Sequence, residues 1–184
     1  MNGNKHLSLV NFLGILFFMF SCNKPSMEPD PEPVVQLPEA TQEGKNTFGC
    51  YINGEPFVPH VDFAFGGVAA VWAGFNEETR LFRTQGTRET KEDKFEDVRF
   101  RAYITDGTGE YSMYSETDTY DGYNGYGSMC TFYHDQSNFG NINITHLDEE
   151  LDIISGTFEM TLINSDCPTG TTLEITDGRF DLRY

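Results

Sequence analysis

The sequence predicts an all-β protein: a single antiparallel β-barrel or β-sandwich of roughly ten strands, preceded by a signal peptide and a disordered linker. The first observation is an alternation of apolar and polar residues with a period of two, clearest over residues 98–104 and 154–162. Such alternation is typical of antiparallel strands that bury one face and expose the other. The second observation is a set of Asn-Gly and Asp-Gly pairs, which accept the positive φ of tight hairpin turns. These pairs begin at Asn53, Asp106, Asp121, Asn124 and Asp177.

Length and charge limit what this protein can be. The chain has 184 residues, which leaves room for one ordinary domain and some additional tail. It carries 29 acidic against 12 basic side chains, a formal net charge of -17. Because nucleic-acid binding needs clustered Lys and Arg, we do not expect nucleic acid as a partner. Aromatic residues make up 14% of the chain, more than disordered chains carry, so we expect a folded core.

Residues 1–21 have the pattern of a lipoprotein signal peptide. The apolar stretch from Leu7 to Phe20 is 14 residues long, shorter than the ~20 that a membrane-spanning helix needs. It is followed at once by Ser21-Cys22, which resembles the bacterial lipobox, although Met19 and Phe20 stand where Leu and a small residue are commoner. In that system the leader is removed and Cys22 carries palmitate or similar acyl chains as a membrane anchor. The alternative is an ordinary secretory signal cut near Ser21.

Residues 22–46 have the composition of a linker that follows the lipidated Cys22. Five of the eight prolines lie there, together with several acidic side chains, and proline favours an extended backbone. The β-domain is expected over residues 47–184. Its candidate strands lie near residues 47–52, 55–59, 61–65, 68–75, 80–85, 97–105, 110–114, 128–134, 139–147, 151–163, 171–176 and 178–184.

The last candidate strand has the simplest pattern of the domain. By its alternation, Phe180 and Leu182 are expected to face the core. Arg179, Asp181 and Arg183 are then expected to face water.

Stretches at both ends of the domain resemble a family of uncharacterised Bacteroidota outer-membrane lipoproteins. The first covers residues 37–59 and contains Tyr51-Ile52-Asn53-Gly54-Glu55. The second covers residues 144–148, 153–160 and 175–181 and contains Ser155-Gly156-Thr157-Phe158. The resemblance implies a β-rich domain outside the cytoplasm on a lipid anchor, and it implies no catalytic residues. The acidic stretch at residues 27–30 also resembles a surface-export signal, which favours the surface face of the outer membrane and leaves the periplasmic face open.

Three cysteines remain after lipidation of Cys22, and a site outside the cytoplasm permits a disulfide between two of them. We favour Cys50 with Cys167, because both belong to the stretches of family resemblance, near the first and last hairpins. The main alternative is no disulfide at all, and Cys130 is the third thiol. No Cys-x-x-Cys spacing supports zinc binding or redox chemistry.

No metal site or cofactor is predicted. His60, His134 and His146 show no spacing typical of metal ligands. The acidic turn at residues 148–152 lacks the alternating oxygen ligands and central Gly of a calcium loop. Gly-x-Ser-x-Gly is absent, so no serine nucleophile is indicated. The sequence therefore favours a protein that is not an enzyme.

The most unusual segment lies between Gly109 and Gly127. It holds five tyrosines among Gly and Asp residues, and such loops suit recognition because tyrosine offers broad contact area and a hydroxyl group. These tyrosines are Tyr111, Tyr114, Tyr120, Tyr123 and Tyr126. The alternative is a long hairpin loop whose tyrosines pack on the rim of the barrel.

Together these observations predict a cell-envelope lipoprotein with a non-catalytic binding or structural β-domain. Its expected partners are the membrane, through the lipid anchor, and a glycan or an envelope protein. The alternatives are a small secreted hydrolase that acts on glycans or peptides, and a subunit of a surface assembly. An exposed aromatic patch would favour binding, and a pocket with convergent polar groups would favour an enzyme. Nothing in the sequence specifies an oligomeric state.

Overall fold

The computed structural model describes residues 35–62, 69–90, 94–114, 122–125, 130–134, 140–164 and 172–184. These residues belong to one compact unit, Val34–Tyr184. The predicted signal peptide and Cys22 lie outside the described residues, as do Tyr120, Tyr126 and Cys167.

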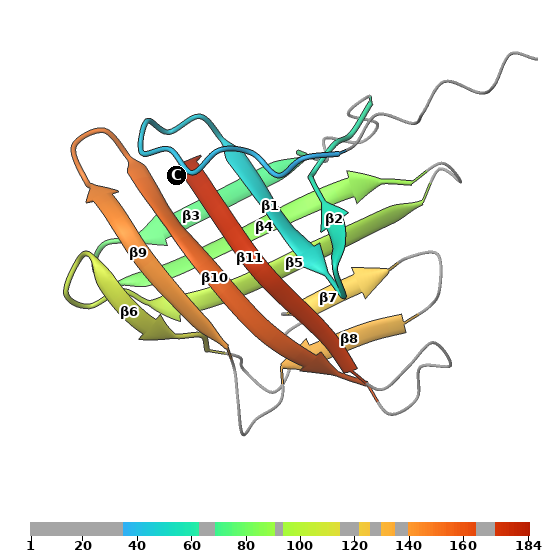
Figure 1. Cartoon of the computed structure of the whole chain (residues 1–184). Helices are drawn as coiled ribbons and strands as arrows, with labels where there is room; N and C mark the ends of the chain where they lie inside the picture. The colour runs from blue at the N-terminus through green and yellow to red at the C-terminus, as the bar shows by residue number, and fades with distance from the viewer. Residues whose placement is uncertain are drawn as a thin grey trace, which may run out of the picture. The chain divides into compact units, whose positions relative to one another are not determined.

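The described part of the chain is all-β, with eleven strands and no helix (Figure 1). The strands are β1 (Thr47–Ile52), β2 (Glu55–Phe57), β3 (Val71–Asn76), β4 (Leu81–Glu89), β5 (Phe95–Tyr103), β6 (Gly109–Ser112), β7 (Gly122–Gly125), β8 (Cys130–His134), β9 (Asn141–Asp148), β10 (Ile153–Ile163) and β11 (Thr172–Arg183). The prediction of an antiparallel all-β domain is confirmed.

All eleven strands belong to one sheet that curls over on itself. Its strands follow the order β2-β1-β11-β10-β8-β7-β5-β4-β3, and β9 pairs with β10 and β6. The first part of β10 pairs with β9, and its last residues pair with β8. In Figure 1, β1, β9, β10 and β11 cross in front of β3, β4 and β5. We call these two groups of strands the front layer and the rear layer.

The core between the layers is built around phenylalanine rings. Phe100 of the rear layer lies 4.6 Å from Phe158 and 6.1 Å from Phe180 of the front layer, measured between ring centroids. Phe82 stacks on Phe180 at 5.5 Å, and Phe48 lies 5.1 Å from Phe158. All five rings are at most 4% exposed. The apolar residues of the period-two alternation therefore face a common core, as the sequence predicts.

Side chains at one end of the sheet hold the two layers together. The Phe75 ring of β3 lies 5.3 Å from the ring of Tyr184, which follows β11. Arg80 ends the β3–β4 turn, and its Nη1 lies 2.7 Å from Glu149 Oε1 in the β9–β10 turn. The same guanidinium lies 4.8 Å from the centre of the Phe75 ring. These contacts join hairpins that are far apart in the sequence.

Residues 37–46 lie on the outer face of the front layer; we call this segment the strap. The side-chain amide of Gln42 donates to Thr145 O at 3.2 Å, and Asn46 Oδ1 accepts the Arg183 N–H at 2.9 Å. Between these points the strap covers the carboxylate of Asp181. The sequence assigns this segment to the linker, whereas in the structure it makes specific contacts with the folded sheet.

The expected orientation of the last strand is confirmed for its apolar residues and wrong for Asp181. Phe180 is 2% exposed and Leu182 is 0% exposed, so both face the core. Asp181 points to the opposite side but is also 0% exposed, and its neighbour Ser155 on β10 is buried with it. The reason is the strap, which covers this part of the outer face and gives Asp181 its hydrogen-bond partners.

The pair Asp177-Gly178 is not a turn between two strands, as the sequence predicts. β11 runs without interruption from Thr172 to Arg183, and the register between β10 and β11 shifts between Phe158 and Met160, opposite this pair. Asp177 has a positive φ of 50°, which fits a β-bulge. A β-carbon at position 178 would lie 2.5 Å from Phe158 O, so glycine is needed where the strands approach closely.

Candidate functional site

The outer face of the rear layer and of β8 carries the exposed aromatic side chains of the described residues. Trp72 of β3 is 49% exposed, Tyr103 of β5 is 42% exposed and Tyr133 of β8 is 44% exposed. Three arginines lie among them on β4 and β5. We call this surface the Trp72 face and define it by Trp72, Arg83, Gln85, Arg99, Arg101, Tyr103 and Tyr133.

The strand register places much of this face in a single row across the sheet. Trp72 pairs with Gln85, Gln85 with Arg99, and Arg99 with Gly122. Gly122 in turn pairs with Tyr133. With a spacing of about 4.8 Å between strands, the row from Trp72 to Tyr133 extends over about 19 Å along the sheet. It is therefore long enough for an extended ligand, with an aromatic ring at each end.

The indole of Trp72 lies over Gly74, the next residue on the same face of β3. A β-carbon at position 74 would lie 3.1 Å from the indole atoms Cη2 and Cζ2. Glycine leaves this space free, so the ring can lie along the sheet and keep a broad surface in contact with solvent. The guanidinium of Arg83, which pairs with Gly74 across the strands, lies 6.0 Å from the centre of the indole.

Arg99 is held in place by the carboxylate of Asp97. Asp97 Oδ1 accepts a hydrogen bond from Arg99 Nε at 2.7 Å, and the two side chains form an ion pair with 2.6 Å between Oδ1 and Nη2. Asp97 is 1% exposed, and burial raises the pKa of its carboxyl, while the neighbouring guanidinium of Arg99 acts to lower it. The pair fixes a guanidinium in the middle of the row, between the two aromatic ends.

The described tyrosines of the predicted binding loop do not form a single site. The Tyr111 hydroxyl donates to Gly107 O at 2.9 Å, and its ring packs against the core. The ring of Tyr114 lies 5.3 Å from that of Tyr103, so Tyr114 borders the Trp72 face. Tyr123 packs against Phe132 with ring centroids 6.2 Å apart. Tyr120 and Tyr126 lie outside the described residues.

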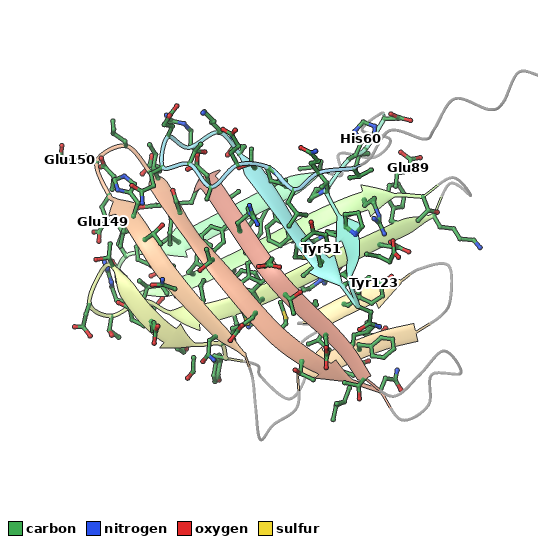
Figure 2. All side chains as sticks on the ribbon, viewed as in Figure 1. Tyr51, His60, Glu89, Tyr123, Glu149 and Glu150 are labelled. Atoms are coloured by element: carbon green, nitrogen blue, oxygen red, sulfur yellow. The ribbon has the colours of Figure 1, made fainter. Side chains whose placement is uncertain are left out.

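Tyr123, labelled in Figure 2, is half-buried among polar side chains. Burial raises the pKa of its hydroxyl, and the hydrogen-bonded carboxylate of Glu96 raises the pKa further. Glu96 also forms an ion pair with Arg88, at 2.5 Å between Oε2 and Nη2. Arg88 in turn lies 4.9 Å from the centre of the Phe57 ring. Tyr123 thus belongs to a partly buried polar cluster that joins β2, β4, β5 and β7.

A second surface feature is a groove of about 600 Å³ on the outer face of β6, β9, β10 and β11. The strap contributes Ala40 to its wall, and polar side chains line most of it. Its polar side chains belong to Glu110, Asn141, Asn143, Thr157, Glu159, Asp177 and Arg179. This groove gathers carboxylates, whereas the Trp72 face gathers arginines and aromatic rings.

The remaining predicted residues have simpler environments. Cys50 is a free thiol that is 0% exposed, and burial raises its pKa to about 12. Its favoured disulfide partner Cys167 is outside the described residues. His60 Nε2 lies 2.6 Å from Asp62 Oδ1 at the surface, and Figure 2 shows His60 near Glu89 at the end of β4. Among the described residues, no group of His, Cys, Asp and Glu side chains could hold a metal ion.

The acidic turn after β9 is held by its own backbone. Asp148 Oδ1 accepts the N–H groups of Glu150 and Leu151 at 2.9 and 3.0 Å. Glu149 pairs with Arg80, as described above, and Figure 2 shows Glu149 and Glu150 at this end of the molecule. The acidic side chains Asp148 and Glu149 are therefore accounted for by contacts within the protein.

The sequence patterns do not predict the Trp72 face. Two local signals were present: Trp72 and Gly74 share a face, as do Arg99 and Arg101, because residues two apart in a strand point the same way. The register between strands, which joins these pairs, could not be deduced from either segment alone. None of the described residues forms a helix that is long and apolar enough to cross a membrane. No protein-family model matches the chain, and no curated protein or solved structure matches it.

Proposed function

We propose that this protein is a cell-envelope lipoprotein, anchored at Cys22 in the outer membrane, whose β-domain binds glycans without catalysis. The observation that carries the proposal is the indole of Trp72, which lies along the sheet over Gly74 and is 49% exposed. The face of a pyranose ring carries C–H groups that pack well on a flat aromatic surface, and tryptophan offers the largest such surface.

The polar groups beside Trp72 suit the hydroxyl groups of a sugar. Gln85 is next to Trp72 in the row and has an amide that both donates and accepts hydrogen bonds. Arg99, one strand further, is held in position by Asp97. Amide and guanidinium groups do not exchange protons at physiological pH, so these side chains orient a ligand and do not act as acids or bases. This chemistry supports binding as the activity of the Trp72 face.

The test is to measure binding of the full-length chain, purified in detergent, to a panel of soluble neutral and acidic polysaccharides. For each polysaccharide that the parent binds, Trp72→Ala is expected to weaken binding at least tenfold, because it removes the stacking surface. Gly74→Val is expected to weaken binding as well, because its side chain would displace the indole although Trp72 is still present. Circular dichroism and thermal melting establish that both variants are folded.

Leu151→Ala is the matched control. Leu151 is 56% exposed in the β9–β10 turn of the front layer, so this variant also loses an exposed apolar side chain but leaves the Trp72 face intact. It is expected to bind like the parent. Unchanged affinity of a folded Trp72→Ala variant would show that the Trp72 face is not the glycan site.

A hydrolase that acts on glycans or peptides is the second candidate, and the groove on the front layer favours it. Glu110, Glu159 and Asp177 all line this groove, and paired carboxylates are the usual groups for glycoside hydrolysis. If this candidate is right, the full-length chain releases reducing sugars or peptides from its substrate, and Glu159→Gln abolishes the release. Binding of polysaccharides without any turnover would favour the Trp72 proposal instead.

A further inference from the structure

We propose that the Trp72 face binds the interior of an extended, β-1,4-linked glycan chain, which lies across the strands from Trp72 to Tyr133. This inference rests on the proposed glycan binding and names the ligand class of that same site. It goes beyond stacking at Trp72, because the ligand must be long enough to contact both aromatic rings and straight enough to follow the sheet between them.

The first argument is the separation of the two rings. Trp72 and Tyr133 stand at the ends of one row that crosses β3, β4, β5, β7 and β8. Four strand spacings of about 4.8 Å place these two positions about 19 Å apart along the sheet. A disaccharide is too short to reach from one ring to the other, whereas a longer oligosaccharide spans them. A ligand with two contact points gains affinity only when it can engage both at once, so the affinity should depend on chain length.

The second argument is the low surface between the rings. The side-chain amide of Gln85 donates to Thr87 Oγ1 at 2.9 Å, which holds Gln85 beside its own strand. Arg99 is held by Asp97, and its side chain is only 24% exposed. The remaining position of the row is Gly122, which has no side chain. These residues therefore lie below a ligand that rests on both rings, and they keep their partners when it binds.

The third argument is that the described strands leave the row open at both ends. At the Trp72 end, β3 is the outermost strand in the order of the described sheet. At the other end, Tyr133 pairs with Ile163 of β10, which is an exposed apolar residue. A site for the end of a glycan needs a wall that stops the terminal sugar, and the described strands form no such wall at either ring. The row therefore suits the interior of a chain.

The shape of the row favours one kind of glycan linkage. Its five positions follow one another directly from strand to strand, so a chain that covers them must be extended. Sugars joined by β-1,4 bonds through equatorial positions form extended ribbons with flat faces. Glucose units joined by α-1,4 bonds form a coil instead, which carries successive rings away from a flat surface. Ligands of the same composition but different linkage should therefore bind differently.

The experiment measures binding of oligosaccharides of two to six sugars to the full-length chain, purified in detergent, by calorimetry. Three β-1,4-linked series contain glucose, xylose or N-acetylglucosamine, and one α-1,4-linked series contains glucose. We expect at least one β-1,4-linked hexasaccharide to bind at least tenfold more tightly than its own disaccharide. The same hexasaccharide should bind at least tenfold more tightly than the α-1,4-linked hexasaccharide.

The variants separate the two aromatic rings. Tyr133→Ala is expected to weaken binding of the hexasaccharide at least fivefold and to leave the disaccharide unaffected, because a disaccharide stacks on the larger ring of Trp72 alone. Trp72→Ala should weaken binding of both. Leu151→Ala, which removes an exposed apolar side chain from the β9–β10 turn, is the control and should bind like the parent. Thermal melting establishes that each variant is folded.

Three results would overturn the inference. Equal affinity for disaccharide and hexasaccharide, lost in Trp72→Ala, would indicate a site for one or two sugars and leave the glycan proposal standing. Unchanged hexasaccharide binding by a folded Tyr133→Ala variant would show that the chain does not follow the row, again without affecting the glycan proposal. If no β-1,4-linked series binds more tightly than the α-1,4-linked series, the ligand class is wrong, and the polysaccharide panel alone then decides the proposed function.

Discussion

The carboxylate of Asp181 is the clearest example of a single residue that organises distant parts of the chain. Five donors surround its two oxygens at 2.6–3.1 Å. They are the hydroxyls of Thr41 and Ser155 and the backbone N–H groups of Glu43, Gly44 and Lys45. Burial alone would raise the pKa of Asp181, but these hydrogen bonds outweigh it and lower the pKa from 3.8 to about 2.

The first prediction is that Asp181→Asn destabilises the fold at pH 7 and not at very low pH. Because the pKa of Asp181 is lower in the folded state, its charge adds stability above about pH 4, and this contribution disappears as the pH falls through about 2. The shift corresponds to about 2 kcal/mol at pH 7. Urea unfolding of parent and variant at pH 7, 4 and 2 measures the difference. Glu174→Gln, at an exposed position of β11, is the control.

The second prediction contrasts two neighbours on β11. Phe180→Ala is expected to cost about 3–5 kcal/mol, because it removes a buried ring that touches Phe82, Phe100 and Phe158. Arg183→Ala should cost under about 0.5 kcal/mol, since that side chain is exposed. Denaturant titration gives both values. Similar stabilities for the two variants would mean that the C-terminal strand does not close the core.

At the scale of elements, the alternation of apolar and polar residues predicts most strands, but it does not predict which segments cover their outer faces. The apolar positions of β5, β9 and β10 face the core as expected, because each strand needs only its own residues to show the pattern. The burial of Asp181 could not be predicted from β11 alone. Its partners Thr41 and Gly44 lie about 140 positions earlier, in a segment with the composition of a linker. The bulge at Asp177 could not be predicted either, because the pair Asp-Gly is also typical of a turn between two strands.

The third prediction concerns where the folded part of the chain begins. Since the strap is bonded to Asp181 and Arg183, limited proteolysis of the full-length chain should leave a stable fragment that begins ahead of Thr41. Asp181→Asn should make residues 41–46 easier to cleave, while Glu174→Gln should not. N-terminal sequencing and mass spectrometry of the fragment identify the cut. A fragment that starts at Thr47 would support the boundary predicted from composition.

At the scale of the whole domain, the two main surface features lie on different layers. The strap and the groove lie on the outer face of the front layer, and the Trp72 face lies on the rear layer and β8. The Trp72 face is not apparent in the sequence, because Trp72, Arg99 and Tyr133 belong to separate strands and are brought into one row only by the register. Clustering of aromatic residues in the sequence, as in the segment from Gly109 to Gly127, suggests a binding loop. The described tyrosines of that segment nevertheless do not form one site.

The last prediction concerns the anchor that would keep this domain at the membrane. The apolar core that ends at Ser21-Cys22 predicts lipidation of Cys22, and acyl chains contribute about 0.8 kcal/mol of membrane affinity for each buried methylene group. The parent should therefore sediment with the outer-membrane fraction, and Cys22→Ser should move to the soluble fraction. Mass spectrometry of the N-terminal peptide should show the acyl chains in the parent only. If both proteins are soluble and carry no acyl chains, the leader is an ordinary secretory signal. If both stay in the membrane fraction, a contact other than the lipid holds the domain there.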